Sequence, residues 1–296
     1  MSDGITIIKP LAITPAMLVS TDVAEADYSA YSAGTTYALG DRVMDNHLIY
    51  QSLVAGNLGN TPSASPAKWV LVSATNRWKL FDTVSSSQTA QATSMTYSVR
   101  PATVVTGIAA VNMTGVTSIR VRMVSDAYGT VYDKTVTRSR PPPSSGWWSW
   151  FFGRRTDPIS SHFDDLPSFA DSVITVDFAG LSNMAVGSLL IGTVSRWGMG
   201  IQYGMSMGIR DYSIKQTNEW GDTILTQRAY ADRDKFSLTV QRGDVKSLRS
   251  YLAGLRATPC LWITPDDILY GYYQDFEILI SYSTVCDCDI TLEGLT

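Results

Sequence analysis

Apolar and polar residues alternate with a period of two along much of this chain, and this alternation predicts half-buried β-strands. Residues 118–124 and 174–178 are the clearest examples. A turn sequence at 126–129 follows the first of them and favours a hairpin. Because such segments recur roughly every 8–15 residues with glycines between them, we expect an antiparallel β-sandwich or jelly roll over residues 78–242.

One segment, residues 243–256, has the periodicity of an amphipathic helix. Its apolar face is formed by Val245, Leu248, Leu252 and Leu255. Asp244 precedes this face as the predicted N-cap, and Pro259 ends the helix. The chain is therefore predicted to be mainly β, with one helix near its C-terminus.

Antiparallel strands are predicted to follow this helix. They fall at residues 260–264, 269–273, 275–283 and 285–293. Together with the helix they form a predicted β-rich C-terminal domain, residues 243–296. In the last strand, Cys286 and Cys288 alternate with Asp287 and Asp289, so that one face is apolar and the other acidic. We interpret both thiols as core residues, since a metal site needs further ligands beside them.

The N-terminal part of the chain divides into an arm and a small aromatic unit. Residues 1–27 begin with a short apolar stretch and carry little to pack on themselves, so we expect them to pack on something else. Residues 28–75 are rich in aromatic and turn residues, with short strands predicted at 41–44, 48–54 and 69–72. So small a unit depends on tightly packed aromatic side chains.

Composition narrows the range of functions. Of the 296 residues, 17% are charged and 45% are hydrophobic, and the net charge is −4. These values exclude disorder for most of the chain and give no electrostatic reason to expect nucleic-acid binding. The sequence has no apolar run long enough for a transmembrane helix and no signal-peptide pattern at its start. We expect a chain that matures in a reducing cytoplasm and offers weakly charged surfaces to other proteins.

The sequence offers little for catalysis. Its two histidines, His47 and His162, lie in turn-like runs, and no nucleophile motif accompanies either of them. Asp266 and Asp267 follow a proline and predict a turn rather than a catalytic pair. The sequence contains neither a phosphate-binding loop nor a zinc motif. We therefore expect no enzymatic activity, no metal and no cofactor.

An aromatic insertion at residues 138–168 interrupts the strand pattern. Its rings are Trp147, Trp148, Trp150, Phe151 and Phe152, and its flanking arginines are Arg138, Arg140, Arg154 and Arg155. Aromatic residues with arginine are typical of interface anchors and of membrane-interface belts. The rings can cover their own sandwich, dock into a neighbouring subunit or contact a bacterial outer membrane. We favour docking into a neighbouring subunit. The prolines at 141–143 stiffen the entry to the loop and hold the rings away from the chain that precedes them.

Residues 28–75 contain an ordered set of aromatic, glycine and polar residues. The set comprises Tyr31, Gly34, Tyr37, Gly40, Asp41, Val43, Tyr50, Ser52, Asn60, Pro62 and Trp69. It resembles the small carbohydrate-binding module of chitinases and cellulases. This resemblance implies sugar stacking by Tyr31, Tyr37, Tyr50 and Trp69. Residues 52–55, where sugar-binding members often carry another aromatic pair, contain none, so a scaffold or docking role stays open.

Further short segments follow in a fixed order. They are residues 76–82, 120–122, 130–133, 203–204, 212–215, 219–222, 259–262, 270–271, 275–276 and 292–295. Together with the module they are similar to tail-tip or baseplate proteins of tailed bacteriophages. The resemblance implies a structural virion protein that is assembled in the host cytoplasm, forms a ring with copies of itself and binds other tail proteins. It also implies contact with a host surface polysaccharide, and a glycan-binding host adhesin is the alternative primary role.

Overall fold

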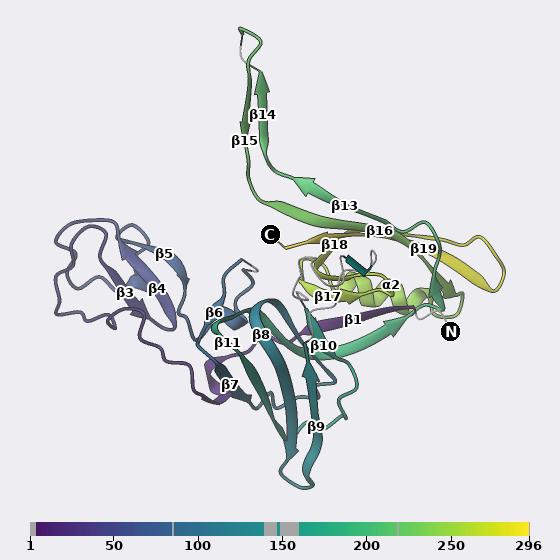
Figure 1. Ribbon diagram of the computed structural model, residues 1–296, viewed down its shortest axis with the longest axis horizontal. Coiled ribbons are helices and arrows are strands. Elements are labelled where there is room, and N and C mark those ends of the chain that lie inside the picture. Colours follow the sequence, from purple (N-terminus) through teal and green to yellow (C-terminus); the bar gives the residue numbers. More distant parts are fainter. Residues whose placement is uncertain (1–3, 85, 139–146, 149–159, 218, 296) are drawn as a thin grey trace.

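The computed structural model describes residues 4–84, 86–138, 147–148, 160–217 and 219–295. Strands account for 54% of the described residues and helical turns for 8%, so the predicted mainly β fold is confirmed. Within the described residues, one large antiparallel sheet has 14 strands, and smaller sheets have 3 and 2 strands (Figure 1).

Two long strands organise the large sheet. They are β8 (Gly107–Ser125) and β11 (Ser172–Trp197), which pair along most of their length. The predicted strands at 118–124 and 174–178 lie inside them and face each other. The predicted hairpin turn connects β8 to β9 (Gly129–Thr137).

The other strands of the large sheet extend this pair. They are β1 (Ile5–Pro10), β2 (Leu18–Thr21), β6 (Thr89–Ala90), β7 (Ser94–Val99), β10 (Ser161–Phe163), β12 (Gly200–Ile201), β13 (Ser206–Asp211), β16 (Tyr230–Gln241), β17 (Cys260–Ile263), β18 (Ile268–Leu279) and β19 (Val285–Gly294). The main path through the sheet is β10-β8-β11-β1-β17-β18-β19-β16-β12. Short 3-10 helices lie at Pro15–Met17, Pro62–Ala64 and Lys79–Phe81.

The N-terminal strand β1 joins the two halves of this sheet. It pairs with β11 on one side and with β17 on the other. Ile5 and Ile7 are buried against the C-terminal strands, while Ile8 faces a third small cluster with Leu190 and Leu261. β1 is therefore an inner strand of the sheet. The N-terminal segment, which we expected to pack on something else, packs here on the rest of the same chain.

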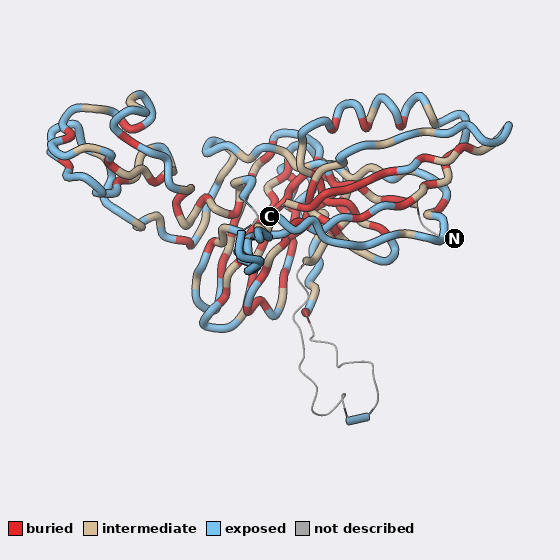
Figure 2. Tube along the Cα trace, turned by 90° about the horizontal axis from the view of Figure 1, so that it is seen from above, coloured by how far each residue is buried: buried red, intermediate tan, exposed pale blue. Residues whose placement is uncertain are grey.

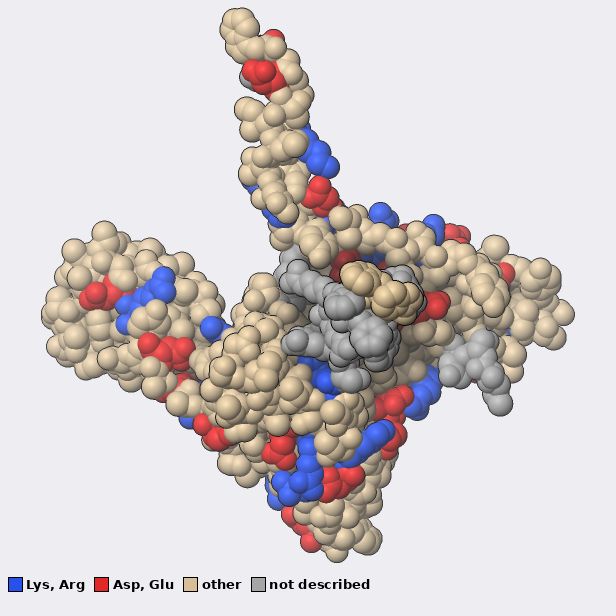
Figure 3. All heavy atoms as spheres, viewed as in Figure 1, with Lys and Arg blue, Asp and Glu red and all other residues tan. Residues whose placement is uncertain are grey.

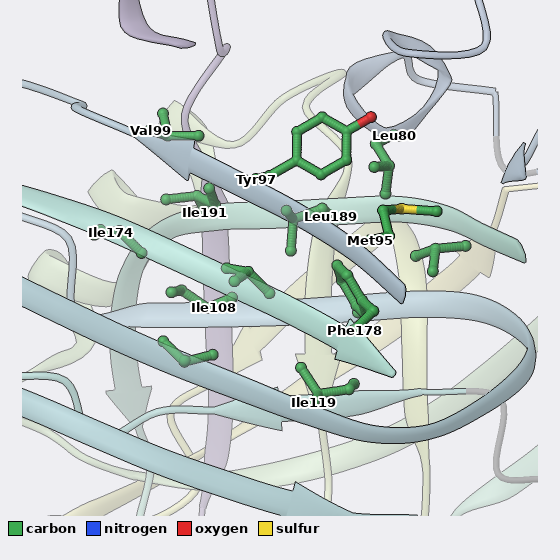
Figure 4. Packing of buried hydrophobic residues seen from close by; sticks show 14 of the residues in the cluster. Leu80, Met95, Tyr97, Val99, Ile108, Ile119, Ile174, Phe178, Leu189 and Ile191 are labelled. Atoms are coloured by element: carbon green, nitrogen blue, oxygen red, sulfur yellow. The ribbon is translucent and has the colours of Figure 1, made fainter. Parts of the chain in front are cut away.

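Two main hydrophobic cores lie along the large sheet. The first is built by β7, β8 and β11, and Figure 4 shows Tyr97 and Phe178 among its packed side chains. The second contains Phe236 and Trp262 together with the helix α2 (Val245–Gly254). Figure 2 shows the buried segments concentrated in the sheet, with α2 lying along its outside.

The helix α2 confirms the amphipathic pattern read from the sequence. Leu248, Leu252 and Leu255 are buried in the second core. The predicted capping role of the Asp244 side chain is wrong, because this side chain makes no capping hydrogen bond. Its backbone is already helical (φ −90°, ψ −8°), and its carbonyl accepts the Leu248 N–H at 2.8 Å.

The C-terminal strands differ from the prediction in one place. The two strands expected at 269–273 and 275–283 form the single strand β18. Its pairing with β19 shifts register between Tyr273 and Asp275, as at a β-bulge. A bulge re-aims side chains without ending a strand, which explains why the alternation appears broken in the sequence.

Strand β19 bears out the burial expected for its thiols. Cys286 and Cys288 are fully buried as core residues. The opposite face carries the acidic side chains, but it is not exposed along its whole length, because Glu293 at its end is buried as well. β19 pairs with β16, so hydrogen bonds join the predicted sandwich, residues 78–242, to the predicted C-terminal domain. The division of the chain into domains stays a prediction.

The small aromatic module forms a separate three-stranded sheet beside the large one (Figure 1). Its strands are β3 (Arg42–Asp45), β4 (Leu48–Ser52) and β5 (Trp69–Ala74). They pair in antiparallel order β3-β4-β5, close to the positions predicted from the sequence.

Candidate functional site

The four aromatic residues predicted to stack on sugar gather in one cluster of the module. Trp69 is 2% exposed, and its indole N–H donates to the Asn60 carbonyl at 2.8 Å. Tyr37 is buried beside it, with ring centroids 5.3 Å apart. Tyr31 stacks on Tyr37 at 5.9 Å, which extends the cluster toward the surface. Trp69 and Tyr37 therefore act as packing residues.

Tyr31 and Tyr50 are half-buried at the edge of this cluster. Burial, and then the charge of Asp45, raise the pKa of Tyr50. A sugar ring stacked on Tyr37 or Trp69 would require the module to open, because their faces are covered. The described geometry thus favours the scaffold role of this module, and sugar binding by it stays a prediction.

His47 lies in the turn between β3 and β4, as the sequence predicts, but it is only partly exposed. His47 contacts Glu25 through its Nδ1 at 2.9 Å, and its ring lies 4.7 Å from that of Trp78. Glu25 also accepts the Thr75 hydroxyl at 2.7 Å, so this carboxylate fastens the module to the chain that precedes it. His162 lies in β10, paired with β8, which corrects the loop expected there.

The aromatic insertion is only partly described. Trp147 and Trp148 are 70% and 62% exposed, and their ring centroids lie 5.6 Å apart. Trp150, Phe151 and Phe152 lie outside the described residues. Arg138, the first of the flanking arginines, is buried, and its guanidinium donates to the Val116 carbonyl at 3.3 Å.

An arm formed by residues 206–230 projects from the large sheet. At its base β13 pairs with β16, and beyond it β14 (Ile214–Thr217) pairs with β15 (Thr223–Thr226). Figure 1 shows the β14–β15 hairpin extending away from the rest of the chain. The hairpin turns near Gly221, whose φ of +89° favours glycine.

Large apolar side chains are exposed along this arm. They are Met207, Ile209, Tyr212, Trp220, Ile224, Leu225 and Tyr230. Ile224 is 55% exposed and Leu225 is 70% exposed. Because these two residues are adjacent in β15, their side chains point to opposite faces of the hairpin. Both faces of the hairpin are therefore open to solvent in the isolated chain.

The surface of the arm is only weakly charged. Figure 3 shows most of it without acidic or basic side chains. Its basic residues are Arg210, Lys215 and Arg228, and its acidic residues are Asp211, Glu219 and Asp222. These charges balance, so the arm carries no net charge that would steer it to a strongly charged partner.

Glu293 at the end of β19 holds the base of the arm. Its side chain is 2% exposed and accepts hydrogen bonds from Arg210 at 2.9 and 3.1 Å and from the Tyr212 hydroxyl at 2.8 Å. Burial raises the pKa of Glu293, but the hydrogen bonds from Tyr212 and Arg210 outweigh it, and the pKa lies below its ordinary value. A charged, directional contact thus fixes the direction in which the arm leaves the sheet.

A hollow of about 610 Å³ lies where the arm bends between its base and the hairpin. Its apolar lining includes Ile209, Ile214, Leu225 and Tyr230. Exposed apolar surface of this kind is costly in water and is typical of an interaction site.

Sequence reasoning did not find this arm. The strand pattern places residues 206–230 inside the predicted sandwich, and the structure corrects that placement. The available signal is in residues 214–217 and 223–226, which flank a glycine turn and do not show the alternation that gives a strand one apolar face. A strand that packs one face against a core carries apolar side chains on that face. The lack of an apolar face in these two segments therefore indicates that they are not packed in the sandwich.

Comparisons with protein-family models, with curated proteins and with solved structures give no match to this chain. Among the described residues, the helices are all too short or too polar to cross a membrane.

Proposed function

We propose that this chain is a structural subunit of a bacteriophage tail tip or baseplate. In this role it forms a closed ring with copies of itself and binds other tail proteins. The assembly part of the proposal rests on the arm, whose apolar side chains are exposed on both faces. The assignment to a phage tail rests on the similarity of ordered sequence segments to tail-tip and baseplate proteins.

An arm of this construction is suited to insertion between subunits. A two-stranded ribbon is marginally stable by itself and gains stability when its apolar faces are covered. Here Ile224 and Leu225 offer one apolar side chain to each face, and Trp220 lies near the tip. A partner that covers both faces would bury all three.

The balanced charges of the arm favour a copy of the same chain as the partner. The chain as a whole is weakly charged, with a net charge of −4, so two copies repel each other little. The arm leaves the large sheet in one direction (Figure 1). An arm that binds a different surface of the next copy makes a head-to-tail contact, and such contacts form a ring when the rotation between copies closes.

Sedimentation velocity of the purified full-length chain tests the assembly. We expect a defined oligomer at neutral pH, and a monomer when Ile224→Ser and Leu225→Ser are combined. The matched control combines Leu53→Ser and Leu58→Ser, which change exposed residues of the module. An arm variant that assembles like the wild type would refute the role of the arm.

Immunoelectron microscopy of the phage tests the assignment to the tail. Antibody against this chain should label the distal end of the tail. Label on the capsid, or particles that contain none of the chain, would refute the proposal.

The exposed indoles of the insertion support a second contact, with another tail protein. Trp147 and Trp148 lie next to each other and open to solvent. Replacement of both by Ser should leave self-assembly of the purified chain unchanged and impair the assembly of complete tails. Normal particles with normal infectivity would rule out this contact.

A further inference from the structure

An acidic hollow of about 840 Å³ lies beside the base of the arm. We use this name for the space bounded by the start of β16, the turn between β17 and β18, the end of β19 and β10. Its lining includes Asp232, Asp266, Asp267, His162 and Tyr270. The sequence at 266–267 lies in the turn between β17 and β18, as predicted, and both residues line this space.

A buried carboxylate lies beneath this hollow. Asp234 is 2% exposed, and its Oδ2 atom has no hydrogen-bond partner within the described part of the chain. It follows Tyr230 and Asp232 on the same face of β16, and both of these line the hollow. A buried polar atom without a partner is costly, and a cation bound in the hollow would offset this cost.

The neighbours of Asp234 are acidic rather than basic. Burial, then the negative charge of Asp267 and a hydrogen bond between the Asp234 and Asp267 carboxyl groups, and last the charge of Asp232, raise the pKa of Asp234 to about 6. The other titratable groups that line the hollow are Asp266, His162, Tyr230 and Tyr270. Among the described residues, no Lys or Arg forms an ion pair with these carboxylates.

The carboxylate of Asp267 is held in place by its own turn. Its Oδ1 atom accepts the Ile268 N–H at 2.8 Å. Its backbone carbonyl accepts hydrogen bonds from the Thr264 N–H and hydroxyl, each at 2.9 Å, and its own N–H donates to that hydroxyl. The negative charge is therefore preorganised to face a ligand rather than free to swing away.

The shape of the hollow favours an organic cation over a bare metal ion. No group of three or more metal-binding side chains is clustered among the described residues. The walls are partly apolar, with Ile263, Pro265 and Leu269 beside the carboxylates. An aliphatic stem can pack on such walls while its charged end meets the acids.

We propose that the acidic hollow binds an ammonium or guanidinium group carried on an aliphatic stem. The charged end pairs with Asp267 and Asp232 and supplies a compensating charge for Asp234, which no Lys or Arg of the described residues provides. The source of the cation is either a basic side chain of a neighbouring copy, which rests on the proposed ring, or a free polyamine.

Isothermal titration of the full-length chain with agmatine, which carries both cationic groups on an alkyl chain, tests this site. We expect the double variant Asp232→Asn, Asp267→Asn to weaken binding by about tenfold or more, since it removes two charges that contact the ligand. The control Asp275→Asn changes an exposed acid outside the hollow and should bind like the wild type. Equal binding by the double variant, or no binding by the wild type, would overturn the proposal.

The pH dependence gives a second measurement. Agmatine affinity should fall as the pH drops through about 6, where Asp234 takes up a proton. The variant Asp234→Asn should show a flat profile over this range, while His162→Gln should keep the fall. The proposal is contradicted if His162→Gln abolishes the pH dependence and Asp234→Asn does not.

The same titrations, repeated with the assembly-deficient arm variant, separate this proposal from the proposed ring. Agmatine should bind that monomer at least as well as it binds the wild type. If agmatine also dissociates wild-type oligomers, the natural cation is a side chain of a neighbouring copy. If assembly is unaffected while binding persists, the natural ligand is a free polyamine. Loss of binding in the monomer with its fold intact would overturn the site within the single chain.

Discussion

The small module and the arm are both antiparallel extensions of the large sheet, but only the module contains a core. In the module, Tyr37, Val43 and Trp69 are buried against one another. In the arm, Ile224 and Leu225 are exposed on opposite faces of the hairpin. The module thus buries its large side chains, whereas the hairpin of the arm exposes them.

This difference shows what a short β extension requires to be stable without a partner. The third strand of the module and its turns wrap around the rings, so about 45 residues suffice to close a small core. The two strands of the arm cannot enclose anything. Its base is held by the contacts of Arg210 and Tyr212 with Glu293, and its tip has no core of its own.

The largest expected effect on stability comes from the core of the module. Trp69→Ala should lower the free energy of unfolding of the module by about 3–5 kcal/mol, because it deletes a buried ring and its hydrogen bond. Urea unfolding followed by tryptophan fluorescence and near-UV circular dichroism measures it. Leu58→Ala, at an exposed position of the same module, is the control. An unaltered unfolding profile for Trp69→Ala would mean that the ring is not a core residue.

The next effect concerns the buried acid beneath the hollow. The folded-state pKa of Asp234 is raised to about 6, so between about pH 4 and pH 6 the folded chain binds more protons than the unfolded chain. The free energy of unfolding therefore falls as the pH rises through this window. Asp234→Asn should raise it by about 2 kcal/mol at pH 7 and leave it nearly unchanged at pH 4. Urea unfolding at both values measures this, and a variant that is less stable at pH 7 would contradict it.

The base of the arm should respond to pH in the opposite direction. The pKa of Glu293 is lowered, so its contribution to stability is present above its unfolded-state pKa and is lost as the pH falls. Glu293→Gln should cost about 1–2 kcal/mol at pH 7, a modest value because Arg210 is half exposed. The loss should shrink on acidification. Chemical unfolding from pH 7 to pH 3 measures it, and a cost that grows toward pH 3 would refute this account.

The smallest effect on monomer stability is expected in the hairpin of the arm. Ile224→Ser with Leu225→Ser should change the free energy of unfolding of the monomer by less than about 0.5 kcal/mol, because both side chains are already in water. Thermal unfolding at a concentration too low for assembly measures it. A loss comparable to that of Trp69→Ala would show that the hairpin folds back onto the chain and that the contrast with the module does not hold.

Much of the fold was predictable because strand alternation reports local burial. The segments 118–124 and 174–178, the three strands of the module and the helical face of α2 each have one apolar side, and each lies where the pattern places it. Residues 206–230 broke this rule. Their strands bury neither face, and the hairpin of β14 and β15 leaves the large sheet while β13 stays paired with β16.

The sequence by itself determined that the chain is mainly β, that Cys286 and Cys288 are core residues and that a small unit is built around aromatic rings. Only the tertiary structure decided which polar groups meet. Arg210 reaches Glu293 across 83 residues of chain, and Asp234 comes to lie beside Asp267 through the packing of separate strands. Such contacts join residues that are distant in sequence, and they leave no periodic trace in it because each partner is a single polar position.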